Sequence, residues 1–151
     1  MTKLQAFWVH GTTVKMEREG YFISKQFAGY AAIFRTYGVE WFHFAIPTPV
    51  ILDGIRSSLK KVFIFYKTEG ITKITAIHVY DAGKKIATFD NLSLAGDHSS
   101  AVDQFNSWFI MPSPEMLFGL GISVLVDFGA QTTGTVPAIS FFAAGADFEI
   151  P

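Results

Sequence analysis

The chain of 151 residues contains no cysteine. This absence excludes a disulfide-stapled fold, a cysteine nucleophile and cysteine-ligated metal sites. Charged side chains are also scarce, at 17% of the residues, and they nearly cancel to a net charge of −1. No stretch is rich in lysine and arginine, so the chain lacks the basic stripe that is typical of nucleic-acid-binding proteins. We therefore expect no nucleic-acid partner.

Long hydrophobic runs are missing as well. No apolar run approaches the ~18 residues of a membrane-spanning helix, so we expect no membrane span. The first apolar run is interrupted by Gln5 and His10, which does not fit a signal peptide. These absences lead us to expect a cytoplasmic protein. The length is that of one domain, which we expect to cover residues 1–151.

Short apolar runs, separated by glycine and proline turns, dominate what is present. They predict an all-β fold, an antiparallel β-sandwich of the jelly-roll or immunoglobulin-like type. Residues 59–68, 71–81 and 84–89 predict three consecutive strands joined by short turns, which we expect to be antiparallel neighbours. Gly83 suits a positive φ in the second turn.

At most one short helix is expected, over Ser99–Phe109, because Val102, Phe105 and Phe109 recur there at helical spacing.

The segment from Met116 to Phe128 has the clearest strand pattern. Alternate residues from Phe118 to Phe128 form a solid apolar ridge, whereas the opposite face carries small residues. The ridge should pack into a core, and the small face leaves room for a close neighbour. We therefore predict that Gly119, Gly121 and Ser123 form an interface.

Four short motifs resemble a family of uncharacterised small all-β proteins of bacteria and fungi. They are residues 6–11 (AFWVHG), 79–81 (VYD), 119–124 (GLGISV) and 144–148 (AGADF). The resemblance spans most of the chain and implies a single β domain. It brings no activity and no site residues.

The four histidines, His10, His43, His78 and His98, lack the His-x-His or His-x-x-x-His spacing of metal ligands. If the strands that carry His43 and His78 were neighbours, the two rings could hold a metal together with one carboxylate. We favour hydrogen-bonded surface histidines and predict no metal site.

Polar loops offer weaker alternatives. Residues 97–100 (DHSS) hold an acid, a base and a hydroxyl, but sequence neighbours rarely converge into a catalytic triad, so turn and capping chemistry is favoured. Asp90, Asn91 and Asp97 could offer oxygen ligands to calcium, but turns also favour these residue types. The Gly119–Val124 segment lacks the third glycine of a dinucleotide-binding loop. We predict no catalytic residue and no cofactor.

Aromatic residues are abundant and often adjacent, as in Trp41-Phe42 and Phe141-Phe142. Adjacent residues of a strand point to opposite faces, so some of these rings must be exposed or covered by a partner. We therefore favour a non-catalytic binding or self-assembling module that forms a homo-oligomer.

Two alternatives remain open. The first is a binder of a small apolar or sugar ligand, with an aromatic-lined pocket. The second is an enzyme that uses His43 or His78 with a carboxylate. The candidate ligand-binding residues are Trp41, His43, Tyr66, His78 and Trp108.

Overall fold

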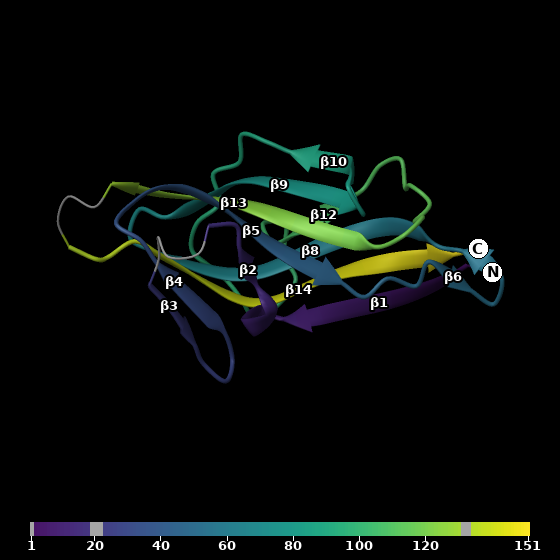
Figure 1. The fold of residues 1–151 in the computed structure, drawn as a ribbon, viewed down its shortest axis with the longest axis horizontal. Coiled ribbons are helices and arrows are strands. Elements are labelled where there is room, and N and C mark those ends of the chain that lie inside the picture. Colours follow the sequence, from purple (N-terminus) through teal and green to yellow (C-terminus); the bar gives the residue numbers. More distant parts are fainter. Residues whose placement is uncertain (1, 19–22, 131–133) are drawn as a thin grey trace.

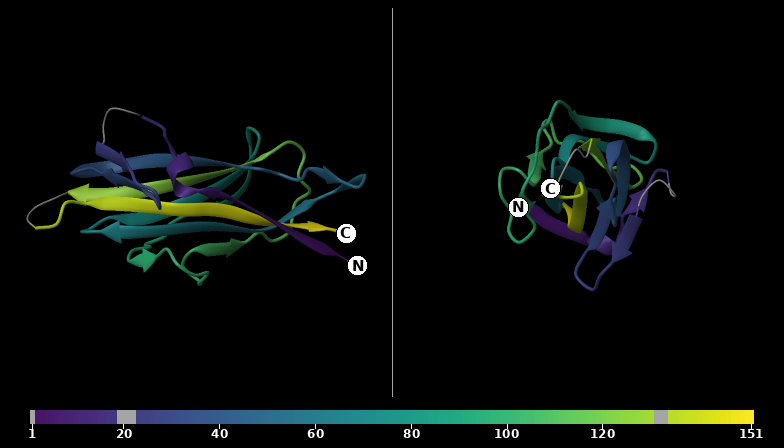
Figure 2. Two further views of the ribbon diagram at one scale, coloured as in Figure 1. Left: turned by 90° about the horizontal axis from the view of Figure 1, so that it is seen from below. Right: turned by 90° about the vertical axis from the view of Figure 1, so that its left-hand side faces the viewer.

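A computed structural model describes residues 2–18, 23–130 and 134–151. Two antiparallel β-sheets face each other and form a β-sandwich (Figures 1 and 2). This confirms the fold class that the alternating apolar runs predict.

The larger sheet has seven strands in the described part of the chain, and β14 and β8 form its centre. β1 and β4 pair with one edge of β14, and β8 pairs with the other edge. Because β1 lies beside β14, the two chain ends lie side by side (Figure 1). The strands are β1 (Lys3–His10), β3 (Ile23–Gln26), β4 (Ala31–Phe34), β8 (Ser58–Glu69), β11 (Asp97–His98), β12 (Ser107–Phe109) and β14 (Ala138–Ile150).

The smaller sheet has five strands in the order β10-β9-β13-β5-β2. They are β2 (Lys15–Met16), β5 (Tyr37–Ile46), β9 (Lys73–Asp81), β10 (Lys84–Phe89) and β13 (Leu120–Ala130). A separate hairpin joins β6 (Ile51–Leu52) to β7 (Ile55–Arg56) through Asp53 and Gly54, both with positive φ. An Asp-Gly pair is well suited to such a two-residue turn.

The core lies between the two sheets. The predicted apolar ridge is buried from Leu120 to Phe128 of β13, as its alternation requires. The prediction was wrong for its first residue, Phe118, which lies before the strand and is exposed. Phe42 and Phe44 of β5 meet Phe141 of β14 across the sandwich, with ring centroids 5.5 and 5.4 Å apart. Apolar contact between the sheets therefore fixes which face of each strand looks outward.

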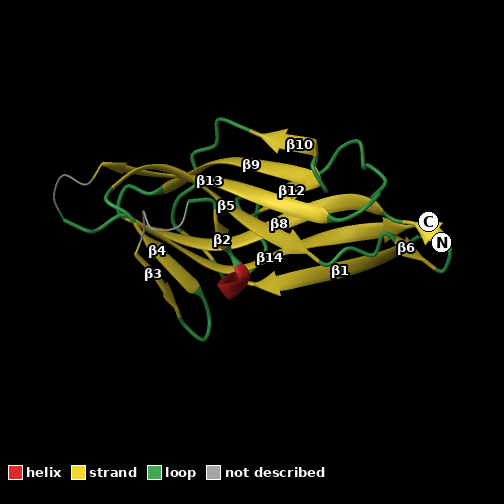
Figure 3. Cartoon of the chain, in the orientation of Figure 1, coloured by secondary structure: helices red, strands yellow, loops and turns green. Residues whose placement is uncertain are grey.

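The expected helix over Ser99–Phe109 is absent. The described residues contain one helical segment, a 3-10 turn at Gly11–Thr13 (Figure 3). Val102, Phe105 and Phe109 are exposed, so a helix here would have no apolar face to bury. Residues 99–106 form a loop, and the last three residues of the segment form β12. No helix in the described residues is long and apolar enough to cross a membrane.

The predicted meander is only half correct. β9 and β10 are antiparallel neighbours, but β8 belongs to the opposite sheet. Gly70, with a φ of 64°, lies in the short link through which the chain crosses between the sheets. The prediction for β8 was wrong because its partners, β14 above all, come from distant parts of the chain. In the turn between β9 and β10, the positive φ falls on Ala82 and not on Gly83.

Candidate ligand-binding face

The outer face of the five-stranded sheet brings together three polar residues from its three central strands. Ser123 of β13 lies directly opposite His43 of β5 on one side and His78 of β9 on the other. Directly paired residues of antiparallel strands share a face. The small face of β13 is thus the floor of a polar strip that runs across the sheet.

A pocket of about 490 Å³ is centred on this strip. It is lined by Glu17, Trp41, His43, His78, Tyr80, Lys85 and Ser123. Three of the residues predicted from the sequence as ligand-binding therefore line one pocket. Trp41 and His43 come from β5, and His78 comes from β9, which is distant in the chain.

Trp41 forms the aromatic wall of the pocket. Its ring lies 4.8 Å from that of His78, at an interplanar angle of 47°. His78 is held from its other side, since its Nε2 atom lies 2.8 Å from Oδ1 of Asp90. Two rings from β5 and β9 are thus fixed against each other above the intervening β13.

Glu40 supports the strand that carries Trp41. Glu40 lies between Val39 and Trp41 on β5. It is only 3% exposed, and its carboxylate accepts hydrogen bonds from Arg18 and Arg35 and from the backbone N–H of Trp41. The ionic contacts offset part of the cost of burying its charge.

A hydrogen-bonded chain runs from Ser123 through His43 to Glu17. Oγ of Ser123 lies 2.8 Å from Nδ1 of His43, and Nε2 of His43 lies 3.2 Å from Oε1 of Glu17. A hydroxyl, an imidazole and a carboxylate in this order resemble a catalytic triad. However, β13 is paired on both sides, so the backbone N–H groups around Ser123 serve the sheet and are not free to form an oxyanion hole.

The other two predicted ligand-binding residues lie elsewhere. Tyr66 of β8 is 0% exposed, and its hydroxyl donates to the carbonyl oxygen of Phe105. Burial raises the pKa of this phenol. Trp108 lies on β12 of the opposite sheet and packs near Phe89. Neither residue lines the pocket, because each belongs to the sheet that faces away from it.

Three pocket residues were missed in the sequence. Tyr80 alternates with His78 on β9, and that pattern could have found it. Lys85 lies opposite Tyr80 across the short β9–β10 turn, which a hairpin register could have indicated. No pattern in the sequence indicated Glu17, since only the fold brings the end of β2 beside β5.

The predicted interface residues are spread over two settings. Gly121 and Ser123 lie on the outer face of the sheet, beside the pocket. Gly119 lies just before β13, where its backbone N–H donates to the carboxylate of Asp81.

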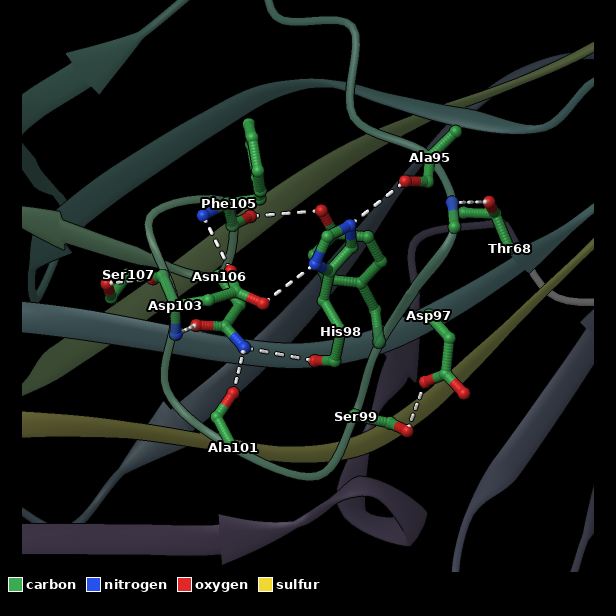
Figure 4. A network of polar contacts seen from close by, with 12 residues as sticks. Thr68, Ala95, Asp97, His98, Ser99, Ala101, Asp103, Phe105, Asn106 and Ser107 are labelled. Atoms are coloured by element: carbon green, nitrogen blue, oxygen red, sulfur yellow. Dashed lines mark hydrogen bonds and ion pairs between the residues drawn. The ribbon is translucent and has the colours of Figure 1, made fainter.

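The loop with the Asp97-His98-Ser99 motif holds a structural network (Figure 4). Nδ1 of His98 lies 2.8 Å from Oδ2 of Asp103, and its Nε2 lies 3.0 Å from the carbonyl oxygen of Ala95. Ser99 donates to Asp97. Burial alone would raise the pKa of Asp103, but hydrogen bonds from His98 and from backbone N–H groups outweigh it and lower the pKa. The motif therefore shapes the loop, as capping chemistry predicts.

The metal alternatives gain no support from the geometry. His43 and His78 are separated by β13, so their backbones are two strand spacings, roughly 10 Å, apart. Asp90 bonds His78, whereas Asp97 bonds Ser99. Within the described residues, no three histidine, aspartate or glutamate side chains are grouped so that they could hold a metal ion.

Three solved structures are similar to this chain. The first is a low-affinity xylan-binding module, CBM86, from Roseburia intestinalis, with a TM-score of 0.50 and 13% identity over 100% of this chain and 96% of that one. The second is a CBM36 domain of a multidomain xylanase from the hindgut metagenome of Trinervitermes trinervoides (TM-score 0.40, 9% identity, 97% of each chain). The third is CBM35 from Paenibacillus barcinonensis (0.44, 14%, 95% of each chain). The likeness of this chain to the CBM86 module, at 13% identity, concerns the fold alone.

Among curated protein sequences, none matches the chain. A family model does match residues 2–148, nearly the whole chain, and it describes a family of unknown function, DUF6623. The chain belongs to this family of unknown function.

Proposed function

We propose that this protein is a non-catalytic carbohydrate-binding domain that holds a sugar on the outer face of its five-stranded sheet. The observation that carries the proposal is the position of Trp41. Its ring stands against His78 at the wall of a pocket whose other lining groups are almost all polar.

This combination suits the chemistry of a sugar. The C–H face of a pyranose ring is apolar and packs against an indole, while its hydroxyl groups need donors and acceptors around the rim. Glu17, Lys85 and Tyr80 offer such groups beside the ring of Trp41. A purely apolar ligand would leave these polar groups without partners, so the lining favours a sugar.

The fold agrees with a binding role. The sandwich resembles that of the xylan-binding module over the whole length of this chain, which makes xylan the first polysaccharide to test. A catalytic role has less support, because Ser123 lies in a strand that is paired on both sides.

The test is isothermal titration calorimetry with oligosaccharides of xylan, cellulose and mannan. We expect the Trp41→Ala variant to lose about 5- to 30-fold in affinity for the best ligand, since one well-packed aromatic ring contributes on the order of 1–2 kcal/mol. Trp108→Phe is the matched control, because Trp108 lies on the opposite sheet.

Thermal melting of both variants shows whether they are folded. Equal affinity of a folded Trp41→Ala variant and the unchanged protein would place the ligand elsewhere. Binding of none of these sugars or of other glycans would refute the proposed function.

A further inference from the structure

The chain Glu17–His43–Ser123 fixes the direction of a hydroxyl at the floor of the proposed sugar site. An ionised carboxylate can only accept hydrogen bonds, so neutral His43 donates its Nε2–H to Glu17. Its Nδ1 atom is then an acceptor, and Ser123 must donate its O–H to it. In this state, Oγ of Ser123 presents only lone pairs to the pocket.

Protonation of His43 reverses this arrangement. Both ring nitrogens of an imidazolium are donors, so Nδ1 then donates to Oγ of Ser123. The hydroxyl hydrogen of Ser123 is released and can point into the pocket. One proton on His43 thus changes the floor from an acceptor to a donor, and adds a positive charge next to it.

We propose that Ser123 is a specificity-determining residue of this site, and that the protonation of His43 selects which sugar group it binds. This proposal rests on the proposed function. With His43 neutral, the site favours a sugar hydroxyl, which can donate to Ser123. With His43 protonated, it also takes the carboxylate of an acidic sugar, which can only accept.

Other charged and titratable groups face His43 and also affect how its charge and the pocket change with pH. Glu17 and Lys15 come from the β2 side, since Lys15 is paired directly with His43. His78, bonded to Asp90, lies beyond Ser123, and Tyr80 and Lys85 line the same pocket. Only the two histidines are of a type that changes charge between pH 5 and 8. A variant must therefore separate the hydroxyl of Ser123 from the charge of the two rings.

The experiment is an NMR titration of the full chain with methyl β-glucoside and methyl β-glucuronide, at pH 8.0 and pH 5.5. The two sugars differ only in bearing CH₂OH or a carboxylate. We expect the affinity for the glucuronide, relative to the glucoside, to rise about tenfold on going to pH 5.5, as for one charge-assisted hydrogen bond gained.

Ser123→Ala removes the hydroxyl but keeps both imidazoles. In this variant we expect the tenfold change to fall to about twofold, the part due to ring charge alone at an exposed site. Ser140→Ala, on the opposite sheet, should keep the full change. A ratio of affinities that does not depend on pH, or a Ser123→Ala variant with the full change, would overturn the proposal.

A second measurement does not depend on any sugar. Long-range ¹H–¹⁵N spectra of the free protein report which nitrogen of His43 carries the proton. We expect the Nε2–H tautomer at pH 8.0, and an Nδ1–H tautomer would overturn the proposal. If the tautomer is as expected but neither this pair nor any other glycan binds, it is the proposed function that fails.

Discussion

Asp81 is the residue that most directly fixes the turn before β13. Its carboxylate accepts hydrogen bonds from the backbone N–H groups of Leu117, Phe118 and Gly119, at 2.7, 3.0 and 3.0 Å. Burial alone would raise the pKa of Asp81, but these three donors and the charge of Arg56 outweigh it, so the pKa lies below its usual value. The folded state therefore favours the ionised form.

We expect Asp81→Asn to lower the free energy of unfolding at pH 7 by about 1.5–3 kcal/mol, as for the loss of a charged hydrogen-bond acceptor. Because the folded pKa is lowered, this stabilisation is complete above the unfolded value of about 3.9 and is lost as the pH falls through the folded pKa. The difference between the variant and the unchanged protein should therefore shrink in acid.

Urea denaturation from pH 7 to pH 3 measures this difference. Asp53→Asn, the same change at an exposed turn, is the control and should have little effect. A constant difference over the whole pH range would show that the ionised carboxylate is not what stabilises the turn.

At the scale of elements, the loop between β11 and β12 depends on Asn106. This side chain is 0% exposed; its Nδ2 donates to the carbonyl oxygens of His98 and Ala101, and its Oδ1 accepts from the N–H of Asp103 (Figure 4). One amide thus closes the loop in place of the helical hydrogen bonds that the sequence led us to expect.

Asn106→Ala leaves these buried backbone groups without their partner. Each unsatisfied group costs about 1–3 kcal/mol, so we expect a destabilisation of at least about 2 kcal/mol by thermal or urea unfolding. The exposed Ser100 lies in the same loop, and Ser100→Ala should change the stability by less than about 0.5 kcal/mol. Equal effects of the two variants would contradict this role of Asn106.

β13 offers a test that separates binding from folding. A side chain at Gly121 would meet its nearest neighbours, Phe44 and Tyr80, at 3.9 and 4.0 Å, which is ordinary contact. We therefore expect Gly121→Asp to fold with a nearly unchanged melting temperature, but to weaken whatever binds this face, because it places a charge beside the pocket. Thermal melting checks the stability of this variant, and calorimetry on the same sample checks its binding. A large drop in the melting temperature would refute the expectation that the variant folds normally.

At the scale of the whole molecule, self-association stays a prediction. Large apolar side chains lie exposed at several places, among them Phe109, Met111 and Phe118. Native mass spectrometry at low micromolar concentration decides the question. A homo-oligomer gives a multiple of 16.7 kDa, whereas a bare monomer would refute the expected assembly and leave the outer face of the five-stranded sheet free for a ligand.

Much of the fold could be predicted from the local pattern. The alternation of β13 correctly assigned its buried ridge and its small outer face, because the side-chain period of a strand is set by the backbone alone. Local spacing failed at Ser99–Phe109, where a helical recurrence of apolar residues has no surface to pack against. The helical spacing of a segment does not reveal whether the folded protein offers a surface for it to pack against.

The arrangement of the candidate site could likewise be predicted only in part from the sequence. The sequence by itself determined that His43 shares a face with Trp41, and His78 with Tyr80, since each pair lies two residues apart on one strand. Only the tertiary structure decided that Ser123 stands between the two histidines, that Glu17 reaches His43, and that Tyr66 and Trp108 belong to the other sheet. The physical reason is that strand order and register follow from burying both apolar faces at once, which depends on all strands together and not on any one of them.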